Sequence, residues 1–378
     1  MKISIERNIL LKLLSHVQNV VEKRNTIPIL SNILINAKAN SITLSATDMD
    51  LSITETADST VIEEGSVTTP AQTLYEIVRK IPDGNEIELI SNNGNKLSVR
   101  SGKSKFSLLC LPKDDFPKIE NVSTNNEFLL SSELLKKIID KTRFAISNEE
   151  TRYYLNGVYM HIVEEHGQKE SKNIQKSLRA VATDGHRLAK FDCEYNDTIK
   201  DIPGVIIPKK TVNELYKLLS DFDGLVKINL SSNKIVFFVG ESILISKLID
   251  GNFPDYKRVI PKENKNTLKV DRLSFSLAVD RVSTITTDKL PVIKLKIMNN
   301  MVNLTSVNNE SGTATEDINV NYSGDEIEIG FNSKYILEMI NNLEDETVIL
   351  DFKDSASPVI AKEESNPNLI YVLMPMRV

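Results

Sequence analysis

Hydrophobic side chains near the start of the chain first recur at helical spacing and then alternate at strand spacing. In residues 7–21 the apolar positions include Leu10, Leu13, Leu14 and Val17, which share one helical face. The two segments that follow, SNILINA and SITLSAT, alternate apolar and polar residues, as half-buried strands do. This pattern predicts a helix followed by antiparallel strands.

A second helical pattern occurs three times. The segment TTPAQTLYEIVRKI at residues 68–81 resembles IIPKKTVNELYKLL at 206–219 and GFNSKYILEMINNL at 330–343. Each copy follows a short apolar run and precedes further alternating segments. Self-similarity at long spacing is typical of a protein built from one structural unit, so the sequence predicts three repeats.

A second sequence landmark recurs at nearly the same intervals as this helical pattern. The tripeptide ATD ends at Asp48 and at Asp184, and a weaker counterpart, SVN, ends at Asn308. The first interval is the longer one for both landmarks, and a polar insert at residues 164–177 accounts for the excess as a surface loop between two strands. Because the two landmarks agree, they strengthen the prediction of three repeats.

Each repeat is predicted to have two halves, and each half to combine one helix with several antiparallel strands. In the first repeat Thr69-Pro70-Ala71-Gln72 fits a capping box with proline as the first helical residue. Asn332 suits the N-cap of the last helix. The six helices are expected at residues 7–21, 71–81, 133–145, 209–221, 272–282 and 333–343.

Polar, turn-prone segments near residues 123–126 and 262–266 separate the repeats. The predicted fold is therefore of the α+β class. Its three domains are expected to span residues 1–124, 125–262 and 263–378.

Composition sets the broad class of the protein. With 378 residues, 40% of them apolar, the chain can bury a core in each domain. Cys110 and Cys193 have no metal-ligand spacing and are expected to be reduced core residues. Charged residues interrupt the N-terminus, which argues against a signal peptide, and the longest apolar run, 369–374, is far shorter than the ~18 residues of a membrane span. These features predict a cytoplasmic protein with no membrane contact.

Charge is distributed unevenly along the chain. The net charge of −6 argues against a uniformly basic nucleic-acid binder. The predicted helices nevertheless hold fourteen basic and seven acidic residues, so the remainder is strongly acidic. Lysines on solvated helix faces would explain this difference. Alternatively, the helices share one surface that faces a polyanion, which a weakly basic lining would hold without gripping.

Five motifs are similar to those of one family and occur in the same order. They are RNTIPILSNILI from Arg24, RYYLNGV from Arg152, ATDGHRLA from Ala182, DGNFPDYKRV from Asp250 and YVLMPMRV from Tyr371. Through these motifs the whole chain resembles the bacterial DNA sliding clamp, the beta subunit of DNA polymerase III.

The resemblance implies a fold and a function. Two chains would join head to tail as a homodimer, forming a six-domain ring with helices lining the hole and strands outside. The ring would encircle double-stranded DNA and tether the DNA polymerase III alpha subunit, the clamp loader, and other polymerases and repair proteins through short clamp-binding peptides. It would be a nucleoid-associated processivity factor with no catalytic activity and no cofactor.

The resemblance also implies three sets of site residues. A peptide pocket between domains 2 and 3 would be formed by Arg152, Leu155, Thr183, Gly185, His186, Arg187, Leu188, Pro254, Arg258, Val259, Asn332, Tyr335, Val372, Met374, Pro375, Met376 and Arg377. Contacts to DNA would come from Arg24, Tyr153, Tyr154, Lys209 and Lys210. The dimer interface would use Lys103, Lys105, Phe106, Leu108, Ile285, Glu316 and Asp317.

Residue chemistry agrees with these roles and leaves plainer alternatives open. Methionines are flexible and can accept several partners, but LMPMRV could also be an edge strand that completes the third sheet. Tyr153 and Tyr154 would point to opposite faces of a strand, so one of them could pack in the core. Lys103 and Lys105 could simply blunt an edge strand.

Five positions depart from the pattern of the family. Gln72, Glu149 and Glu150 would weaken contacts to DNA, and Ala356 and Pro358 would alter the rim of the pocket.

Two rival functions remain at the level of sequence. An enzyme could be centred on Asp184 and His186, although neither a nucleophile nor metal partners accompany them, and Asp184-Gly185 also fits a tight turn. A repeat scaffold without DNA could use the same pocket.

Overall fold

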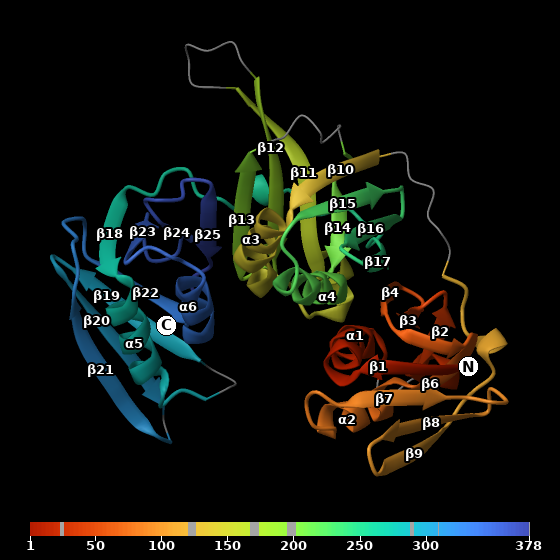
Figure 1. The fold of residues 1–378 in the computed structure, drawn as a ribbon. Coiled ribbons are helices and arrows are strands. Elements are labelled where there is room, and N and C mark those ends of the chain that lie inside the picture. The colour runs from red at the N-terminus through yellow and green to blue at the C-terminus, as the bar shows by residue number, and fades with distance from the viewer. Residues whose placement is uncertain are drawn as a thin grey trace. The chain divides into compact units, whose positions relative to one another are not determined.

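The structure, a computed structural model, describes residues 1–22, 26–119, 126–166, 174–194, 202–287, 291–308 and 310–377. Figure 1 shows the elements along the chain. In the first repeat they are β1 (Lys2–Glu6), α1 (Arg7–Val20), the 3-10 helix η1 (Pro28–Ser31), β2 (Asn32–Lys38), β3 (Ser41–Thr47), β4 (Leu51–Asp58), β5 (Thr60–Glu63), β6 (Gly65–Pro70), α2 (Ala71–Lys80), β7 (Glu86–Ile90), β8 (Lys96–Ser101), β9 (Ser104–Leu109) and η2 (Lys113–Asp115).

The second and third repeats follow the same plan. The second contains β10 (Asn126–Ser131), α3 (Ser132–Thr142), η3 (Arg143–Ala145), η4 (Glu150–Leu155), β11 (Gly157–His166), β12 (Ile174–Thr183), β13 (Arg187–Glu194), β14 (Val205–Pro208), α4 (Lys209–Ser220), β15 (Leu225–Leu230), β16 (Lys234–Val239), β17 (Ser242–Lys247) and η5 (Tyr256–Arg258). The third contains β18 (Asn266–Asp271), α5 (Arg272–Ser283), β19 (Val292–Met298), β20 (Met301–Asn308), β21 (Gly312–Asn319), β22 (Ile327–Asn332), α6 (Ser333–Asn341), β23 (Thr347–Phe352), β24 (Val359–Lys362) and β25 (Leu369–Leu373).

Every α-helix in the described residues begins at the residue after a strand, and all six lie where the sequence predicts them. Asn332 caps α6, because its side chain accepts a hydrogen bond from the Lys334 N–H at 3.0 Å. The predicted capping box before α2 is wrong. Pro70 is not the first helical residue, because it occupies the N-cap position and is the last residue of β6, and α2 begins at Ala71 without a side-chain cap.

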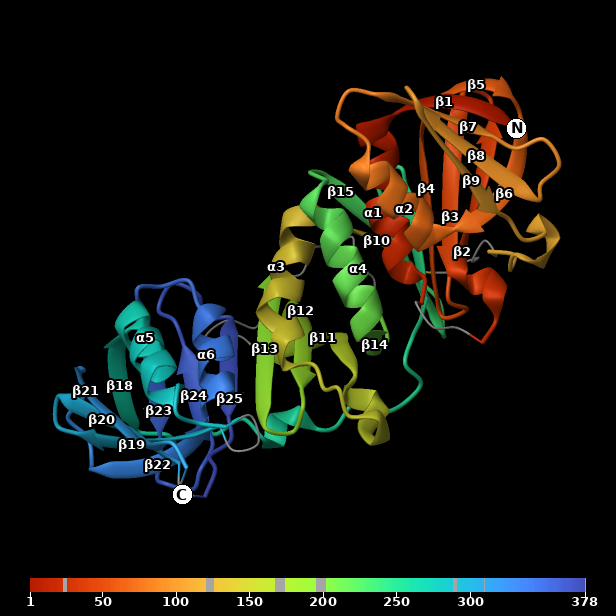
Figure 2. The ribbon, with the colours of Figure 1, turned by 90° about the horizontal axis from the view of Figure 1, so that it is seen from below.

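Apolar helix faces cover the sheets. α1 buries Leu10, Leu13, Leu14 and Val17 against β3 and β4, which confirms the helical face read from the sequence. Figure 2 shows α1 beside α2 and α5 beside α6. Burial of one such leucine contributes roughly 1.5–3 kcal/mol, so these faces fix the helices on their sheets.

The described residues form two compact units. The first unit contains an eight-stranded sheet in the order β10-β15-β16-β17-β4-β3-β2-β6 and a five-stranded sheet in the order β5-β1-β7-β8-β9. The second contains an eight-stranded sheet in the order β14-β11-β12-β13-β25-β24-β23-β18 and a four-stranded sheet in the order β21-β20-β19-β22. Each eight-stranded sheet thus combines strands of two successive repeats.

The two seams between repeats have the same register. In the first unit β17 pairs with β4, and the Lys247 N–H donates to the Asp50 carbonyl at 2.8 Å. In the second unit β13 pairs with β25, and the Met374 N–H donates to the His186 carbonyl at 2.9 Å. The segment YVLMPM therefore begins in an interior strand, and the alternative of an edge strand is wrong.

The landmark that defines the repeats is a turn in each of them. The side-chain oxygens of Asp48, Asp184 and Asn308 each accept hydrogen bonds from the N–H groups two and three residues later, at 2.7 to 3.1 Å. Asp and Asn favour such turns. This common turn confirms the three-fold repeat, including its weaker third copy.

The structure modifies the predictions for the polar insert and for one of the two cysteines. The insert at 164–177 is not wholly a loop, since β11 continues to His166 and β12 begins at Ile174, while residues 167–173 lie outside the described part. Both cysteines are free, but only Cys193 is buried, and Cys110 is half-buried. No helix among the described residues is long and apolar enough to span a membrane.

The seam between β17 and β4 predicts that two leucines of the second repeat differ in how much stability is lost when each is replaced by alanine. Leu244 is fully buried opposite Ile53. Leu244→Ala should lower the free energy of unfolding by about 2–5 kcal/mol, because the cavity cannot collapse within a paired sheet. Leu225→Ala is the matched control, since this side chain is 64% exposed and should change stability by at most about 0.5 kcal/mol. Urea unfolding measures both, and equal midpoints for the two variants would contradict the assignment.

Candidate functional site

The second unit holds a pocket of about 290 Å³ where β13 of the second repeat meets β25 of the third. Its walls are mostly apolar and include two arginines. The lining residues are Arg152, Tyr154, Leu155, Thr183, Gly185, Arg187, Leu188, Pro254, Tyr256, Val259, Val372 and Met374.

Strand pairing creates the apolar wall of this pocket. Leu188 lies opposite Val372 in the β13–β25 ladder. Both are buried in one cluster with Val181 and Tyr256. Met374 follows β25 and is 37% exposed, so an apolar ligand would meet a wall already formed by two repeats.

The turn before β13 sets the mouth of the pocket. Gly185 has φ +88°, a left-handed conformation that a side chain would strain, and a Cβ there would lie 2.6 Å from Arg152 Nη1. Glycine therefore allows the Arg152 guanidinium to approach the turn. Arg152 is itself held by the Glu149 carboxylate, and this hydrogen bond lowers the pKa of Glu149.

Arg187 links the pocket to α6 of the third repeat. Its guanidinium donates to Asp184 Oδ2 at 3.2 Å and to the Phe144 carbonyl at 2.6 Å, and it forms an ion pair with Glu338 of α6. The ring centroid of Tyr335, also on α6, lies 4.4 Å from Arg187 Cζ. With its side chain only 10% exposed, Arg187 acts mainly as a cross-link inside the second unit.

A polar network lies behind Tyr256. The His161 Nε2 atom is 2.9 Å from the Tyr256 hydroxyl, and Arg179 links that hydroxyl to Asp192, which also binds Lys190 at 2.6 Å. Burial lowers the pKa of His161, because desolvation disfavours the charged ring. The network therefore favours a neutral His161 and holds the tyrosine ring in the pocket wall.

The structure brings together ten of the predicted pocket residues: Arg152, Leu155, Thr183, Gly185, Arg187, Leu188, Pro254, Val259, Val372 and Met374. Tyr256 was missed, although the motif FPDYKRV contains it, and Tyr154 was expected to contact DNA.

The other predicted pocket residues do not line this cavity. His186 stacks on Tyr335 at 6.1 Å between ring centroids, Asn332 caps α6, and the Met376 N–H donates to the Gly330 carbonyl. Arg258 lies in a neighbouring groove and pairs with Asp255 at 2.8 Å. Pro375 is half-buried and Arg377 is exposed.

The residues predicted to contact DNA have different surroundings. Tyr153 and Tyr154 lie in the 3-10 helix η4, so the prediction of alternating strand positions is wrong, and their rings meet edge to face at 5.8 Å. Lys209 Nζ donates to Asn148 Oδ1 at 2.5 Å. Lys210 Nζ donates to Asp48 Oδ2 at 2.5 Å and to the Val20 carbonyl at 2.8 Å, which commits its charge to the seam in the first unit. Arg24 lies outside the described residues.

The residues predicted for the dimer interface lie on or near the edges of two sheets. Among the described strands, β9 ends one sheet and carries Lys103 and Lys105 at or beside its exposed start, with Phe106 38% exposed and Leu108 half-buried. β21 ends another, where Glu316 pairs with Arg281 at 2.5 Å and Asp317 accepts from Asn303 at 2.6 Å. Ile285, just after α5, is half-buried.

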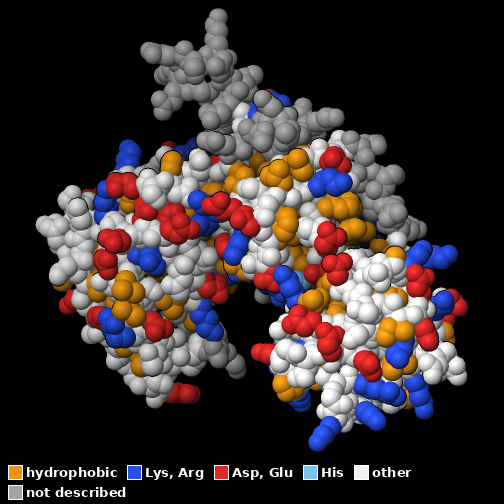
Figure 3. Space-filling model, in the orientation of Figure 1, with side chains coloured by type: hydrophobic (Ala, Val, Ile, Leu, Met, Phe, Trp, Pro, Cys, Tyr) orange, Lys and Arg blue, Asp and Glu red, His pale blue; other side chains and the backbone are white. Residues whose placement is uncertain are grey.

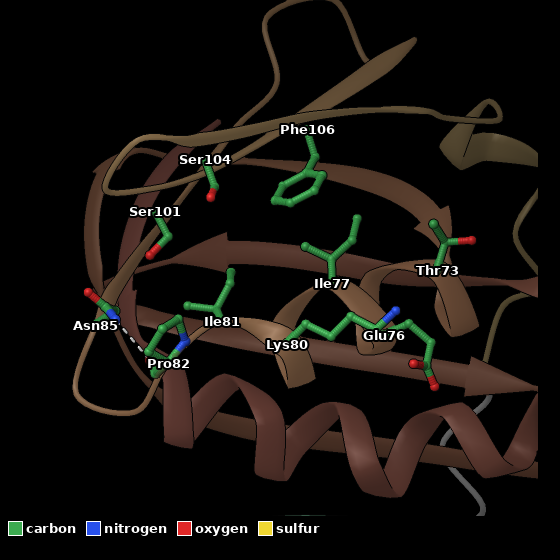
Figure 4. Close-up of a pocket in the computed structure, with 10 residues that line it drawn as sticks. All are labelled: Thr73, Glu76, Ile77, Lys80, Ile81, Pro82, Asn85, Ser101, Ser104 and Phe106. Atoms are coloured by element: carbon green, nitrogen blue, oxygen red, sulfur yellow. Dashed lines mark hydrogen bonds between the residues drawn. The ribbon is translucent and has the colours of Figure 1, made fainter.

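A second cavity, of about 470 Å³, lies beside β9. Figure 4 shows Phe106 of β9 facing Ile77 of α2, with Ile81 and Pro82 near the end of that helix. Lys80 and Glu76 line it as well, so an apolar floor has a charged rim.

Asp184 and His186 do not form a catalytic pair. The Asp184 carboxylate accepts the N–H groups of the turn and the Arg187 guanidinium, while the His186 ring stacks on Tyr335. Within the described ranges, no group of three His, Cys, Asp or Glu side chains is arranged to hold a metal ion.

Three family models match consecutive parts of the chain. The N-terminal, central and C-terminal domains of the DNA polymerase III beta subunit match residues 1–120, 129–255 and 257–377. The chain belongs to the DNA polymerase III beta subunit family.

Relatives of this family match over their whole length. The beta sliding clamp of Caulobacter vibrioides is 45% identical over 379 residues, and that of Escherichia coli K12 is 36% identical over 379 residues, with 100% of both chains covered in each case. A crystal structure of the Bartonella birtlesii sliding clamp bound to griselimycin is 46% identical, covers 100% of both chains and has a TM-score of 0.94. As a member of the beta subunit family, this chain is a sliding clamp, a processivity factor and not an enzyme.

Burial of His161 predicts an acid-sensitive step in the stability of this beta subunit. Since burial lowers its pKa, the neutral ring is favoured in the folded state. The contribution of the neutral ring to the free energy of unfolding should be complete above the free imidazole pKa of about 6.5. Below that pH the unfolded state binds the proton first, so this contribution should be lost as the pH falls through the lower pKa of the folded state.

Thermal unfolding from pH 7.5 down to pH 5 should therefore show a smaller loss of Tm for His161→Gln than for the wild type. His186→Gln is the control, because His186 lies on the exposed turn. Parallel pH profiles for His161→Gln and the wild type would contradict the role of this ring.

Proposed function

We propose that two copies of this chain join head to tail into a ring around duplex DNA. The pocket at the β13–β25 seam then captures short peptides of the DNA polymerase III alpha subunit, the clamp loader, and other polymerases and repair proteins. The proposed domains span residues 1–124, 125–262 and 263–378, and the ring acts in the cytoplasm, at the nucleoid.

One observation carries the proposal: successive repeats join by the same edge-to-edge step. β4 pairs with β17, and β13 pairs with β25 in the equivalent register. By their order in the repeat, β21 corresponds to β4 and β13, and β9 corresponds to β17 and β25. Among the described strands neither β9 nor β21 has such a seam partner, so a further step requires a second copy, and a repeated heterologous contact can close a ring.

The shared turn and the hairpin of β9 define the register of that step. Ser104 follows the β8–β9 hairpin as Ser242 follows the β16–β17 hairpin, and Ser242 lies opposite Glu55. Glu55 lies opposite Leu44, four residues before Asp48, and Glu316 lies opposite Leu304, four residues before Asn308. The equivalent register therefore places Ser104 opposite Glu316 of the second copy and Lys103 opposite Asp317.

Helix packing at the existing seams supports the same joint. In the first unit α1 meets the end of α4 through Lys12 and Asp221, at 3.6 Å. In the second unit Lys141 of α3 donates to the Asn342 carbonyl after α6, at 2.7 Å. By analogy α5 should meet α2 of the second copy.

The surfaces of those two helices fit each other. Leu273 and Leu277 on α5 are 60% and 46% exposed, and the cavity between α2 and β9 has an apolar floor. Figure 3 shows Lys and Arg side chains gathered over β8 and β9. These are complementary to the acids of β21, as expected of a joint with an apolar centre and charged flanks.

A disulfide placed in this register tests the ring. Ser104→Cys with Glu316→Cys should cross-link two copies on mild oxidation, because directly opposed Cα atoms of antiparallel strands lie within disulfide range. Once loaded and then cross-linked, the protein should stay on nicked circular DNA and be lost when the circle is cut, since it is held by topology.

Ser104→Cys with Thr315→Cys is the control, because one residue of offset turns the second side chain to the opposite face. Equal cross-linking of both pairs would contradict the register. Equal retention on circular and linear DNA would contradict the ring.

Removing residues 374–378 tests the pocket. The truncation deletes the Met374 side chain from the wall and the Met374 N–H bond to the His186 carbonyl. Binding of a labelled alpha-subunit peptide, followed by fluorescence anisotropy, should weaken by at least about 100-fold, or about 2.7 kcal/mol.

The mass of the truncated protein in solution serves as its control. It should remain twice the chain mass of 42.4 kDa. A monomeric product would show that the interface and not the pocket was damaged.

A further inference from the structure

A second depression continues from the partner pocket along the third repeat. This basic groove, of about 730 Å³, is lined by Lys257, Arg258, Val259, Ile260, Pro261, Lys262, Glu263, Asn264, Lys353, Ser357, Pro358 and Met374. Val259 and Met374 belong to both cavities. A chain that leaves the pocket past these two residues would enter the groove directly.

The groove has a different chemistry from the pocket. Its lining carries four basic side chains, Lys257, Arg258, Lys262 and Lys353, against one acidic side chain, Glu263. Apolar surface from the half-buried Ile260 and Pro261 forms its floor. The positive charge therefore surrounds a strip on which an extended chain could lie.

Part of this charge already has partners. Arg258 pairs with Asp255 at 2.8 Å, and Lys353 pairs with Glu263 at 2.9 Å, which lowers the pKa of Glu263. The nearby Asp354 carboxylate is occupied by the N–H groups of Ala356 and Ser357. These acids therefore do not neutralise the rest of the groove.

Two lysines remain available. Lys257 and Lys262 are exposed, and within the described residues neither has an ion pair. They stand at either side of Val259, Ile260 and Pro261 in the sequence, next to the wall shared with the pocket. An anionic ligand in the groove could form ion pairs with these two lysines without breaking an existing ion pair.

We infer that the basic groove binds acidic residues flanking the peptide that occupies the partner pocket. The inference rests on the proposed peptide capture and adds a charge preference to it. A peptide flank is favoured over a nucleic acid because the groove shares the apolar residues Val259 and Met374 with the pocket and has apolar surface from Ile260 and Pro261 beside its charges. Such a flank would distinguish partners whose apolar segments are alike, because exposed charges tune association and specificity more than total affinity.

Three peptides test the inference on the full-length protein. The first is the labelled clamp-binding peptide of the alpha subunit, and the other two carry four added glutamates at its N-terminus or its C-terminus. Each has a counterpart with four glutamines. Anisotropy at about 50 mM salt should show that glutamates at one end tighten binding about three- to tenfold over glutamines, and that the gain disappears at about 500 mM salt.

Lys257→Gln with Lys262→Gln should abolish that gain while the unextended peptide binds as it does to the wild type. Lys38→Gln with Lys265→Gln is the matched control, since both lysines are exposed and neither lines the groove; this variant should keep the gain.

Several results would overturn the inference. These are the absence of a glutamate gain at either end, an equal gain in the Lys257/Lys262 variant, or a loss in that variant of binding to duplex DNA instead of to the extended peptide. In each of these cases binding of the unextended peptide leaves the proposed pocket intact. Failure of the unextended peptide itself to bind would overturn the proposed function and the inference together.

Discussion

The pairing of strand edges between successive repeats is the interaction on which this structure depends. A half-sheet with an open edge exposes backbone N–H and C=O groups that must find partners. β4 satisfies this need with β17, and β13 with β25, so that each eight-stranded sheet belongs to two repeats. A repeat is therefore completed by its neighbours, and β9 and β21 are the corresponding strands that lie at sheet edges among the described residues.

The pocket is a consequence of one of these seams. Leu188 and Val372 come from different repeats and become neighbours only because β13 and β25 pair. The same pairing sets the turn with Gly185 beside Met374. Arg187 then joins the turn to α6, through Glu338 and the ring of Tyr335. The apolar wall of the site belongs to paired strands, and charged groups lie at its mouth and along the adjoining basic groove.

Several polar residues that could suggest catalysis serve this architecture instead. Asp184 holds a turn that recurs at Asp48 and Asn308, and Asp48 in addition holds Lys210 at the first seam. Their side-chain oxygens accept hydrogen bonds from the N–H groups of the turn, and the two carboxylates also bind Arg187 and Lys210, so these contacts are structural. A processivity factor needs persistent shape more than reactive groups, and these side chains maintain it.

The sequence by itself determined the repeat, the six helices and the α+β class. Each depends on local periodicity, on landmark spacing, or on a cap such as Asn332, and local rules govern all three. It also brought most of the pocket residues into one set, although that set came from resemblance to the family. Only the tertiary structure decided that YVLMPM begins in an interior strand, that Lys210 is committed to Asp48, and that Tyr256 lines the pocket. These three facts depend on which distant segments become neighbours. The energy of strand pairing and burial is non-local, so no pattern within a single segment encodes it.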